Sequence, residues 1–407
     1  MFSAQSKKGL VFNDIIFINN AQARERAAQP GGEKVINATI GALLDERGKL
    51  VTFPSVDEIH RNLDIAAQSS YAPMGGYPSF LKAAEHFCFE EFRPERHIEG
   101  VVMSGGLAGI HHALVNYTEP GDFILTTDWH WGPYDGIAKE AGRKVKTFPL
   151  LSQGGPDWEV LEQTMKELAC EQSTLFLLIN TPAHNPTGYS MTHKEMEHLI
   201  DLCNEIAHPV ILFLDVAYIE YAPRGKKRLF SSLSRLKTNT LALVDYSISK
   251  GFAKYGLRTA ALFAIHQSRE PLDEFRHMML LSNRGIHGSV SSTGQLLLAA
   301  LYEDKSMMRK YREEIGNWRR VLKERGRVFF HELKPSLAMP HDDGFFAAVQ
   351  CEDAAGRCET LKEENIFLIP LNKGLRVALC SMTADQARTT ARALNRLSEK
   401  FHLPYDL

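Results

Sequence analysis

Residues 241–258 read LALVDYSISKGFAKYGLR, and this stretch decides the fold. The mainly apolar run at 241–246 is typical of a buried strand, and Lys250 follows where such a strand ends. Lys250 is either a surface residue at a strand exit or a partly desolvated amine with a lowered pKa, the form that bonds to carbonyl groups. Eight residues later, Arg258 together with the Ser247 hydroxyl has the chemistry of a phosphate clamp. A lysine beside a phosphate site is a specific pairing.

Outward from this stretch, short β-rich runs alternate with helical patterns between residues 100 and 265. The runs are Phe123–Thr127, Leu175–Asn180, 210–214, 241–246 and 260–264, with helix candidates such as 192–207 between them. Continuous apolar strands separated by helices predict a parallel sheet that is covered on both faces. In sheets of this α/β class, ligands collect at the carboxyl ends of the strands.

The C-terminal third has a different pattern. Residues 304–333 combine many charges with apolar residues at helical spacing, which predicts one long amphipathic helix that leads out of the first domain. Beyond it the sequence predicts strands at 345–349, 366–369 and 375–379, and a helix at 383–400 with a threonine cap. We therefore expect a large α/β domain over 46–305, with a mainly parallel central sheet flanked by helices, and a smaller α+β domain formed by 306–407 with the N-terminal arm 1–45.

Composition excludes several classes of protein. The 407 residues carry 47 basic and 49 acidic side chains, a net charge of −2, so no broad basic field for non-specific binding of nucleic acid is present. No apolar run reaches the roughly 18–20 residues that span a bilayer, and no secretory signal is evident. The six cysteines are scattered without a CxxC pair, which favours free thiols over disulfides or a metal site. We expect a cytoplasmic protein that binds neither membrane nor metal.

Three further motifs follow predicted strands. Asp215 directly follows the run at 210–214, and Tyr218 comes three residues later. The Asp215 carboxylate could simply cap a turn. Alternatively, it could keep the nitrogen of a ligand ring protonated while the Tyr218 hydroxyl binds an oxygen on that ring. Asn185 lies in the turn TPAHNPTG at residues 181–188, where its amide can donate to a ligand oxygen. Gly105 and Gly106 precede a helix start, where free backbone N–H groups form an anion site.

The order of these motifs resembles the class I aminotransferases of the aspartate and aromatic aminotransferase type, which use pyridoxal 5′-phosphate. The resemblance covers nearly the whole chain, including the 35 residues between Asp215 and Lys250. It rests on Tyr71-x4-Gly76, Gly105-Gly106, Trp131, Asn185-Pro-Thr-Gly, Asp215-x2-Tyr218, Ser247-x2-Lys250-x7-Arg258 and Arg376. It implies that family's fold, with a large cofactor domain and a small domain.

The resemblance also implies roles for individual residues. Lys250 would bond to the cofactor and later move a proton, Asp215 would hold the proton of the ring nitrogen, and Tyr218 and Asn185 would bind the ring oxygen. Trp131 would stack on the ring, and the phosphate would be held by Gly105, Gly106, Leu107, Ser247 and Arg258. For the substrate, the implied residues are Gly41, Trp131, Asn185 and Arg376, with Arg376 gripping the α-carboxylate. The counterpart of Tyr71 reaches the phosphate of a neighbouring subunit, which implies a homodimer with shared sites.

Two departures from the family bear on affinity and substrate. Leu107 stands where the family usually has Thr or Ser, which removes one hydroxyl contact with the phosphate. Met278 falls where aspartate enzymes carry an arginine for the substrate side chain, although Arg276 and Arg284 are close enough to substitute. Together with Trp129, Trp131 and Tyr134, this favours an aromatic or other neutral amino acid over aspartate.

Three activities remain open at this point. The leading one is transamination between an L-amino acid and a 2-oxo acid. A pyridoxal-phosphate lyase that eliminates a β or γ substituent would use the same residues. A cofactor-sensing regulator would need a DNA-binding module, and no basic helix-turn-helix segment is evident in the sequence.

Overall fold

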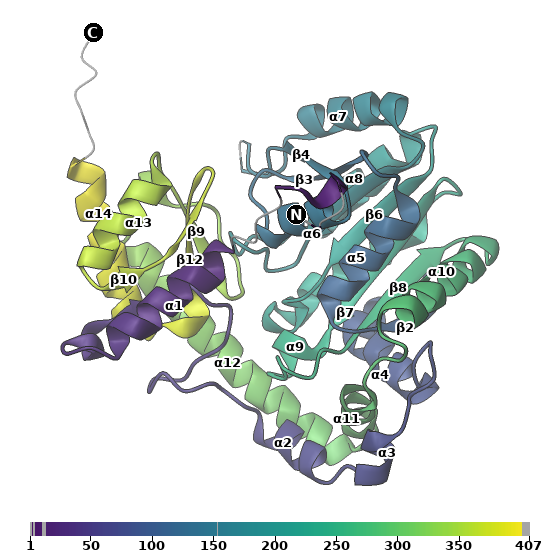
Figure 1. Cartoon of the computed structure of the whole chain (residues 1–407), viewed down its shortest axis with the longest axis horizontal. Helices are drawn as coiled ribbons and strands as arrows, with labels where there is room; N and C mark the ends of the chain where they lie inside the picture. Colours follow the sequence, from purple (N-terminus) through teal and green to yellow (C-terminus); the bar gives the residue numbers. More distant parts are fainter. Residues whose placement is uncertain (1, 3–4, 10–13, 153, 401–407) are drawn as a thin grey trace.

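The computed structural model describes residues 2, 5–9, 14–152 and 154–400. Its large domain is built on a seven-stranded sheet in the order β2-β8-β7-β6-β5-β3-β4 (Figure 1). The strands are β2 (His97–Met103), β3 (Phe123–Thr127), β4 (Lys144–Phe148), β5 (Leu175–Asn180), β6 (Val210–Asp215), β7 (Thr240–Ser247) and β8 (Ala260–His266). Only β8 runs antiparallel to its neighbours, so the predicted mainly parallel sheet is confirmed.

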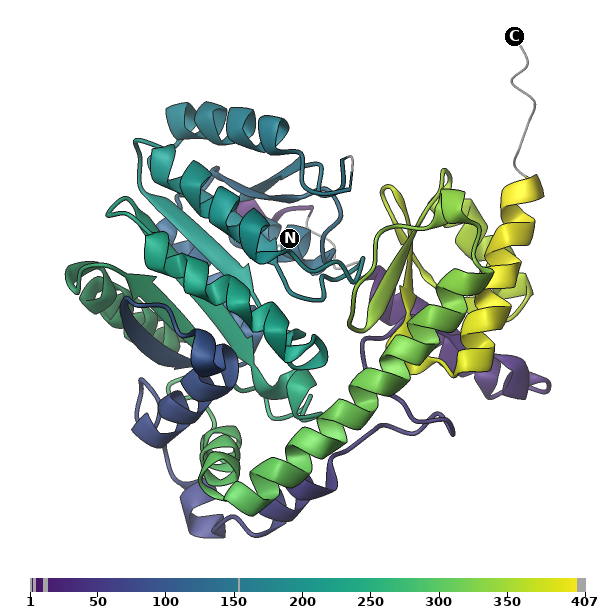
Figure 2. The same cartoon turned by 180° about the vertical axis from the view of Figure 1, so that it is seen from behind.

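The central strands are buried on both faces, as their continuous apolar sequences predict. Successive residues of β5 alternate between two cores: Leu175 and Leu177 belong to one cluster of buried side chains, and Phe176 and Leu178 belong to the other. Helices cover both clusters (Figure 2). The first is covered by α4 (Pro78–Phe89), α7 (Trp158–Glu171) and α8 (His193–Glu205), and the second by α5 (Gly106–Tyr117), α6 (Pro133–Glu140) and α10 (Glu270–Ile286).

The topology gathers several chain segments at one edge of the sheet. The parallel strands β5, β6 and β7 all end there, at Asn180, Asp215 and Ser247. Because β8 runs the opposite way, its first residues, which follow Arg258, lie at the same edge. This edge is where sheets of this class bind ligands.

The long helix predicted at 304–333 is α12 (Lys305–Glu332), and its N-cap Asp304 accepts hydrogen bonds from the Ser306 and Met307 backbones. It runs from the large domain to the small one (Figures 1 and 2). The remaining helices are α1 (Ile15–Ala27), α2 (Pro54–Arg61), α3 (Ile65–Ser69), α9 (Ile248–Gly251), α11 (Ser292–Glu303), α13 (Ala354–Glu363) and α14 (Ala384–Lys400). Among the described residues, no helix is both long and apolar enough to cross a membrane.

The small domain contains an antiparallel sheet of β11 (Ile369–Leu371), β12 (Gly374–Ala378) and β9 (Phe346–Gln350). The strand expected at 366–369 is in fact divided between β10 (Ile366–Phe367) and β11, because β10 leaves that sheet to pair with β1 (Ile36–Asn37) of the N-terminal arm. Thr383 caps α14 as predicted, with its Oγ1 accepting from the Gln386 backbone N–H at 3.2 Å. The boundaries 46–305 and 306–407 stay a prediction.

Candidate active site

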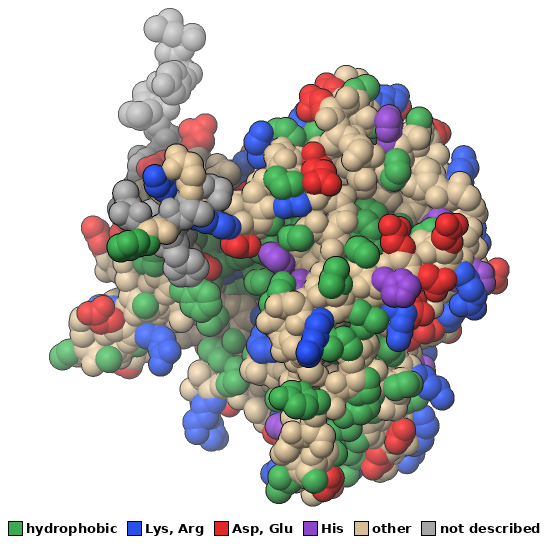
Figure 3. All heavy atoms as spheres, turned by 45° about the vertical axis from the view of Figure 1, so that its right-hand side comes forward, with side chains coloured by type: hydrophobic (Ala, Val, Ile, Leu, Met, Phe, Trp, Pro, Cys, Tyr) green, Lys and Arg blue, Asp and Glu red, His purple; other side chains and the backbone are tan. Residues whose placement is uncertain are grey.

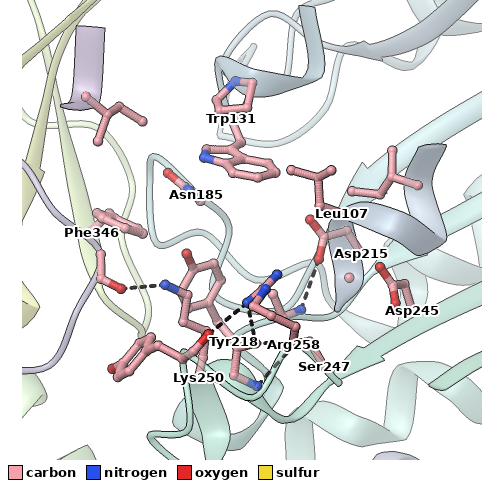
Figure 4. Close-up of a pocket in the computed structure, with 18 of the residues that line it drawn as sticks. Leu107, Trp131, Asn185, Asp215, Tyr218, Asp245, Ser247, Lys250, Arg258 and Phe346 are labelled. Atoms are coloured by element: carbon pink, nitrogen blue, oxygen red, sulfur yellow. Dashed lines mark hydrogen bonds between the residues drawn. The ribbon is translucent and has the colours of Figure 1, made fainter. Parts of the chain in front are cut away.

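A cavity of about 390 Å³ opens between the ligand-binding edge of the large sheet and the small domain. Figure 4 shows that its wall combines side chains from β6, β7, α9 and the loop after β5 with small-domain residues such as Phe346. Most of the site residues predicted from the sequence line it: Gly41, Gly106, Leu107, Trp131, Asn185, Asp215, Tyr218, Ser247, Lys250, Arg258 and Arg376. The fold thus brings together residues that are up to 335 positions apart in the sequence, from Gly41 to Arg376.

Lys250 lies on the short helix α9, directly after β7, and its side chain points into the cavity (Figure 4). Its Nζ donates a hydrogen bond of 2.5 Å to the Gly41 carbonyl, and it forms no ion pair with any described carboxylate. Burial lowers the pKa of Lys250 to about 8. A substantial fraction of the amine is therefore neutral and nucleophilic near neutral pH.

The backbone around Lys250 is held by two tyrosines from other elements. The Tyr221 hydroxyl donates to the Lys250 carbonyl at 3.1 Å, and the Tyr311 hydroxyl donates to the Gly251 carbonyl at 3.0 Å. Both tyrosines are fully buried. These contacts fix the start of the lysine side chain relative to the sheet edge.

Asp215 is a buried carboxylate whose two oxygens are both partnered. Oδ2 accepts from the Tyr134 hydroxyl at 2.5 Å, and Oδ1 accepts from the Ala217 backbone N–H at 3.1 Å. Burial raises the pKa of Asp215, while the Tyr134 and Ala217 hydrogen bonds act in the opposite direction. Tyr134 therefore supports Asp215 and does not line the cavity, so it gives no support to the expected preference for an aromatic or neutral substrate.

Arg376 is a buried cation that forms no ion pair with a carboxylate among the described residues. Its guanidinium donates to the Thr39 carbonyl at 2.6 Å and to Asn185 Oδ1 at 3.4 Å, and its centre lies 4.5 Å from the Phe346 ring. Its Nε has no hydrogen-bond partner. Burial lowers the pKa of Arg376 to about 10. A buried guanidinium with a free donor fits a ligand carboxylate.

The start of α5 and Arg258 form an anion cradle. Gly105 has φ +81°, a conformation that favours glycine, and a Cβ there would be 2.4 Å from the Arg258 guanidinium, which would have to move away. Arg258 donates to Ser249 Oγ at 3.2 Å, and Ser247 Oγ donates to Ser249 Oγ at 3.1 Å. Ser249 thus joins the site although the sequence analysis did not single it out. The N–H groups of the first turn of α5 complete the cradle.

Several expected residues lie elsewhere. Tyr71 is 93% exposed, and Met278 packs beside the second core on α10. Arg276 pairs with Glu99 at 2.7 Å, and Arg284 donates to the Gly288 carbonyl. None of these four lines the cavity that this chain forms, and Trp129 is likewise buried in the first core.

The N-terminal arm supplies three residues of the wall that the sequence analysis missed: Asp14, Ile16 and Phe17. Asp14 is the N-cap of α1, and Ile16 and Phe17 lie in its first turn. No local pattern marks them, because they lie at a helix start and not at the end of an apolar strand. Asp245, a second buried carboxyl in the wall, was hidden inside an apolar strand.

The residues present fit pyridoxal 5′-phosphate. Three cations, Lys250, Arg258 and Arg376, face one cavity, and none is ion-paired with a described carboxylate. The cradle suits a phosphate group, the neutral fraction of Lys250 suits an aldehyde, and Asp215 suits a protonated ring nitrogen. The unpartnered Nε of Arg376 leaves a place for a carboxylate substrate.

A family model described as aminotransferase class I and II matches residues 33–394. Among curated proteins, the cytoplasmic aspartate aminotransferase of Dictyostelium discoideum is 24% identical over 288 residues, which is 69% of this chain and 64% of that protein. The chain thus spans just under two thirds of that relative's length. The aromatic-amino-acid aminotransferase of Escherichia coli K12 is 24% identical over 300 residues, or 71% of this chain and 74% of that protein.

Solved structures agree over nearly the whole chain. An aminotransferase from Anaerococcus prevotii has a TM-score of 0.93 at 30% identity, covering 98% of this chain and 99% of that one. An aromatic-amino-acid aminotransferase from Burkholderia pseudomallei, covalently bound to pyridoxal phosphate, has a TM-score of 0.78 at 18% identity, covering 97% and 100%. At 18% identity, the likeness to the Burkholderia pseudomallei structure supports the fold alone.

Proposed function

The chain belongs to the class I and II aminotransferases, which depend on pyridoxal 5′-phosphate, and from this premise we propose that it transfers the amino group of an aromatic or other neutral L-amino acid to a 2-oxo acid. The observation that carries the proposal is a set of three cations around one cavity, Lys250, Arg258 and Arg376, none of them ion-paired with a described carboxylate. Lys250 would bond to an aldehyde, Arg258 would bind a phosphate and Arg376 would bind an α-carboxylate.

The cofactor, when bound, supplies an electron sink for the bond at the substrate α-carbon. In our proposal, Lys250 holds the cofactor covalently at rest, and its Nζ then carries the proton that leaves the α-carbon. Asp215 holds the proton on the ring nitrogen, and Tyr134 orients Asp215. Burial around Lys250 supports this role, since it lowers the pKa of the amine to about 8.

The remaining site residues position the two reactants. Tyr218 and Asn185 bind the ring oxygen, Trp131 covers the ring, and the cradle of Gly105, Gly106, Leu107, Ser247 and Arg258 holds the phosphate. Ser249 adds a hydroxyl beside Arg258, and so offsets the one missing at Leu107. Arg376 binds the substrate α-carboxylate, with Gly41 closing over it.

Apolar residues at the cavity wall support a neutral donor. Ile16, Phe17, Trp131 and Phe346 line the cavity, and its three cations already have partners in the cofactor and the α-carboxylate. An aspartate side chain would add a second carboxylate without a cation from this chain, and an unpaired buried charge costs several kcal/mol. Aspartate transamination remains the alternative, and it requires a cation from a partner subunit.

We further propose a cytoplasmic homodimer with shared sites. Tyr71, Ile65, Leu281 and Ile286 are 57–93% exposed, an unusual degree for large apolar side chains. Hydrophobic side chains gather in Figure 3 toward the end of the molecule that carries α3 and α11. A second copy that covered this surface would bring Tyr71 to its partner's phosphate site. A monomer in solution with full activity would contradict this proposal.

The test is a substrate panel. Steady-state kcat/KM for phenylalanine, tyrosine, leucine and aspartate, each with 2-oxoglutarate, should favour the first three. A clear lead for aspartate would show that a partner subunit supplies a cation to the cavity. Because elimination needs a leaving group on the β or γ carbon, a lyase is tested separately with L-cysteine, from which it would release sulfide, ammonia and a 2-oxo acid independently of 2-oxoglutarate.

A further inference from the structure

A second buried carboxyl, Asp245, lines the cavity beside Asp215 (Figure 4). The two residues are register partners on the parallel strands β6 and β7, so their side chains leave the sheet on the same face. Asp245 is 1% exposed, and its Oδ1 has no hydrogen-bond partner among the described residues. Asp215, by contrast, accepts a hydrogen bond at each oxygen. The surroundings of Asp245 are thus poorly suited to a carboxylate.

The first turn of α5 lies directly on Asp245. A Cβ at Gly106 would be 2.9 Å from Asp245 Oδ2, and a Cβ at Gly109 would be 3.0 Å from Oδ1. Glycine at these two positions, three residues apart on one helix face, lets the helix start approach the carboxyl. The same turn provides the N–H groups of the anion cradle. Asp245 therefore lies beside both Asp215 and the helix start that contributes to the cradle.

The charges around Asp245 favour its neutral form. Burial raises the pKa of Asp245 well above its ordinary value, and the nearby charge of Asp215 raises it further. The other titratable groups around it are Tyr134 from α6, Cys88 from α4 and, across the cavity, Lys250 from α9. The helix dipole of α5 favours the ionised form, but this effect is smaller than the cost of an unpaired buried carboxylate.

We propose that Asp245 acts as a protonated carboxylic acid that donates a hydrogen bond into the cavity beside the anion cradle. A protonated carboxyl has one O–H donor, which an anion or the Asp215 carboxylate can accept. The proposal rests on the proposed function only in that the cradle holds a phosphate group. Asp245 is then a positioning residue. Its ionisation at alkaline pH weakens anion binding, because it removes the O–H donor and adds a negative charge beside the bound anion.

The test uses sulfate, which is a dianion throughout the pH range, as a probe of the full chain freed of cofactor. Calorimetric titrations from pH 6 to 9.5 compare the wild type with Asp245→Asn, whose amide keeps a donor but cannot ionise. Wild-type affinity should fall by up to tenfold per pH unit once Asp245 ionises. The variant should show only the shallower fall that deprotonation of Lys250 causes in both proteins. Equal pH slopes in the two proteins, together with no infrared band of a protonated carboxylic acid in the wild type, would overturn the proposal.

Arg258→Ala separates this inference from the proposed function. It should weaken sulfate binding at every pH, because it removes the cation of the cradle. If sulfate binding is unaffected by Arg258→Ala, the phosphate site itself is misassigned and both proposals fail. If Arg258→Ala weakens binding but the wild type shows neither a steeper slope than Asp245→Asn nor the infrared band of a protonated carboxylic acid, only the role of Asp245 fails.

Thermal unfolding without any ligand gives an independent reading. When the pKa of an acid is raised in the folded protein, the free energy of unfolding falls as pH rises above the pKa of that acid in the unfolded chain. The reason is that the unfolded chain then ionises while the folded protein keeps the acid protonated. The Tm of Asp245→Asn should therefore gain on the wild type between pH 5 and 8. A Tm loss of the same size at every pH would indicate a structural carboxylate and overturn the proposal.

Infrared spectra keep the test valid if Asp245→Asn does not fold, because they need no variant at this position. The wild type at pH 8, where an ordinary carboxyl group is fully ionised, should show the carbonyl band of a protonated carboxylic acid. Absence of this band would overturn the proposal.

Discussion

Replacement of Tyr134 by phenylalanine tests how Asp215 is held. Tyr134 is 1% exposed, and its hydroxyl donates to Asp215 Oδ2 at 2.5 Å. Phenylalanine fills the same space in the second core but leaves Oδ2 without a partner. The Ala217 N–H, at 3.1 Å, and the Asn180 side chain would still stabilise the charged form of the carboxylate.

The size of the effect follows from the charge on the acceptor. A hydrogen bond to a charged group contributes about 1.5–3 kcal/mol, equivalent to roughly one to two pKa units. Burial already raises the pKa of Asp215, and loss of a donor to its charged form raises the pKa further. A protonated Asp215 cannot stabilise a protonated ring nitrogen, so cofactor affinity should fall by roughly tenfold at pH 6–7. The deficit should shrink as pH rises, because a higher pH favours the ionised form of Asp215 in both proteins.

The assay is equilibrium binding of pyridoxal 5′-phosphate to the cofactor-free protein, from pH 6 to 9. Tyr117→Phe is a matched control, because Tyr117 is a tyrosine of α5 whose buried hydroxyl has no hydrogen-bond partner among the described residues. It should leave the affinity within about twofold of the wild type. Wild-type affinity in Tyr134→Phe, or a deficit that grows with pH, would refute the reasoning.

Three further predictions concern the cations of the cavity. Lys250→Ala should fold, as judged by circular dichroism, but show no transamination, because the covalent anchor and proton carrier are lost; measurable turnover would exclude the proposed role. Arg376→Gln should lower kcat/KM by about 100-fold, since a charged hydrogen bond to the α-carboxylate is lost; an unchanged value would mean that another group binds the carboxylate. The rate at which the cofactor-free wild type captures pyridoxal 5′-phosphate should rise by about tenfold per pH unit below the Lys250 pKa of about 8 and level off above it, because the neutral amine reacts. Stopped-flow absorbance measures this rate. A rate that does not change with pH would contradict the lowered pKa.

The predictable part of the site is the part that follows strand ends. Asn185, Asp215 and Lys250 each come shortly after a run of apolar residues, and parallel strands bring their carboxyl ends to one edge whatever their order in the sheet. The sheet itself was predictable for the same reason, since strands buried on both faces have continuous apolar sequences. The division of residues 366–369 between β10 and β11 could not be predicted, because it depends on the pairing of β10 with β1, a strand of the N-terminal arm that is distant in the sequence.

The residues that could not be predicted depend on long-range packing. Tyr134 supports Asp215 from 81 positions away, and nothing near Tyr134 in the sequence shows that the first turn of α6 faces the end of β6. Asp245 interrupts an apolar strand, but the sequence does not tell whether such a carboxyl is paired. Ile16 and Phe17 reach the cavity only because the N-terminal arm packs with the small domain.

The most direct test of the proposed activity is a single half-reaction without an acceptor. The purified holoenzyme is mixed with L-phenylalanine, and the 2-oxo acid, ammonia and pyridoxamine 5′-phosphate that form are quantified. We predict 2-oxo acid in an amount equal to the bound cofactor, with an equal amount of pyridoxamine 5′-phosphate and no ammonia. Formation of ammonia in step with the 2-oxo acid, or the absence of any product with phenylalanine, tyrosine, leucine and aspartate, would contradict the account.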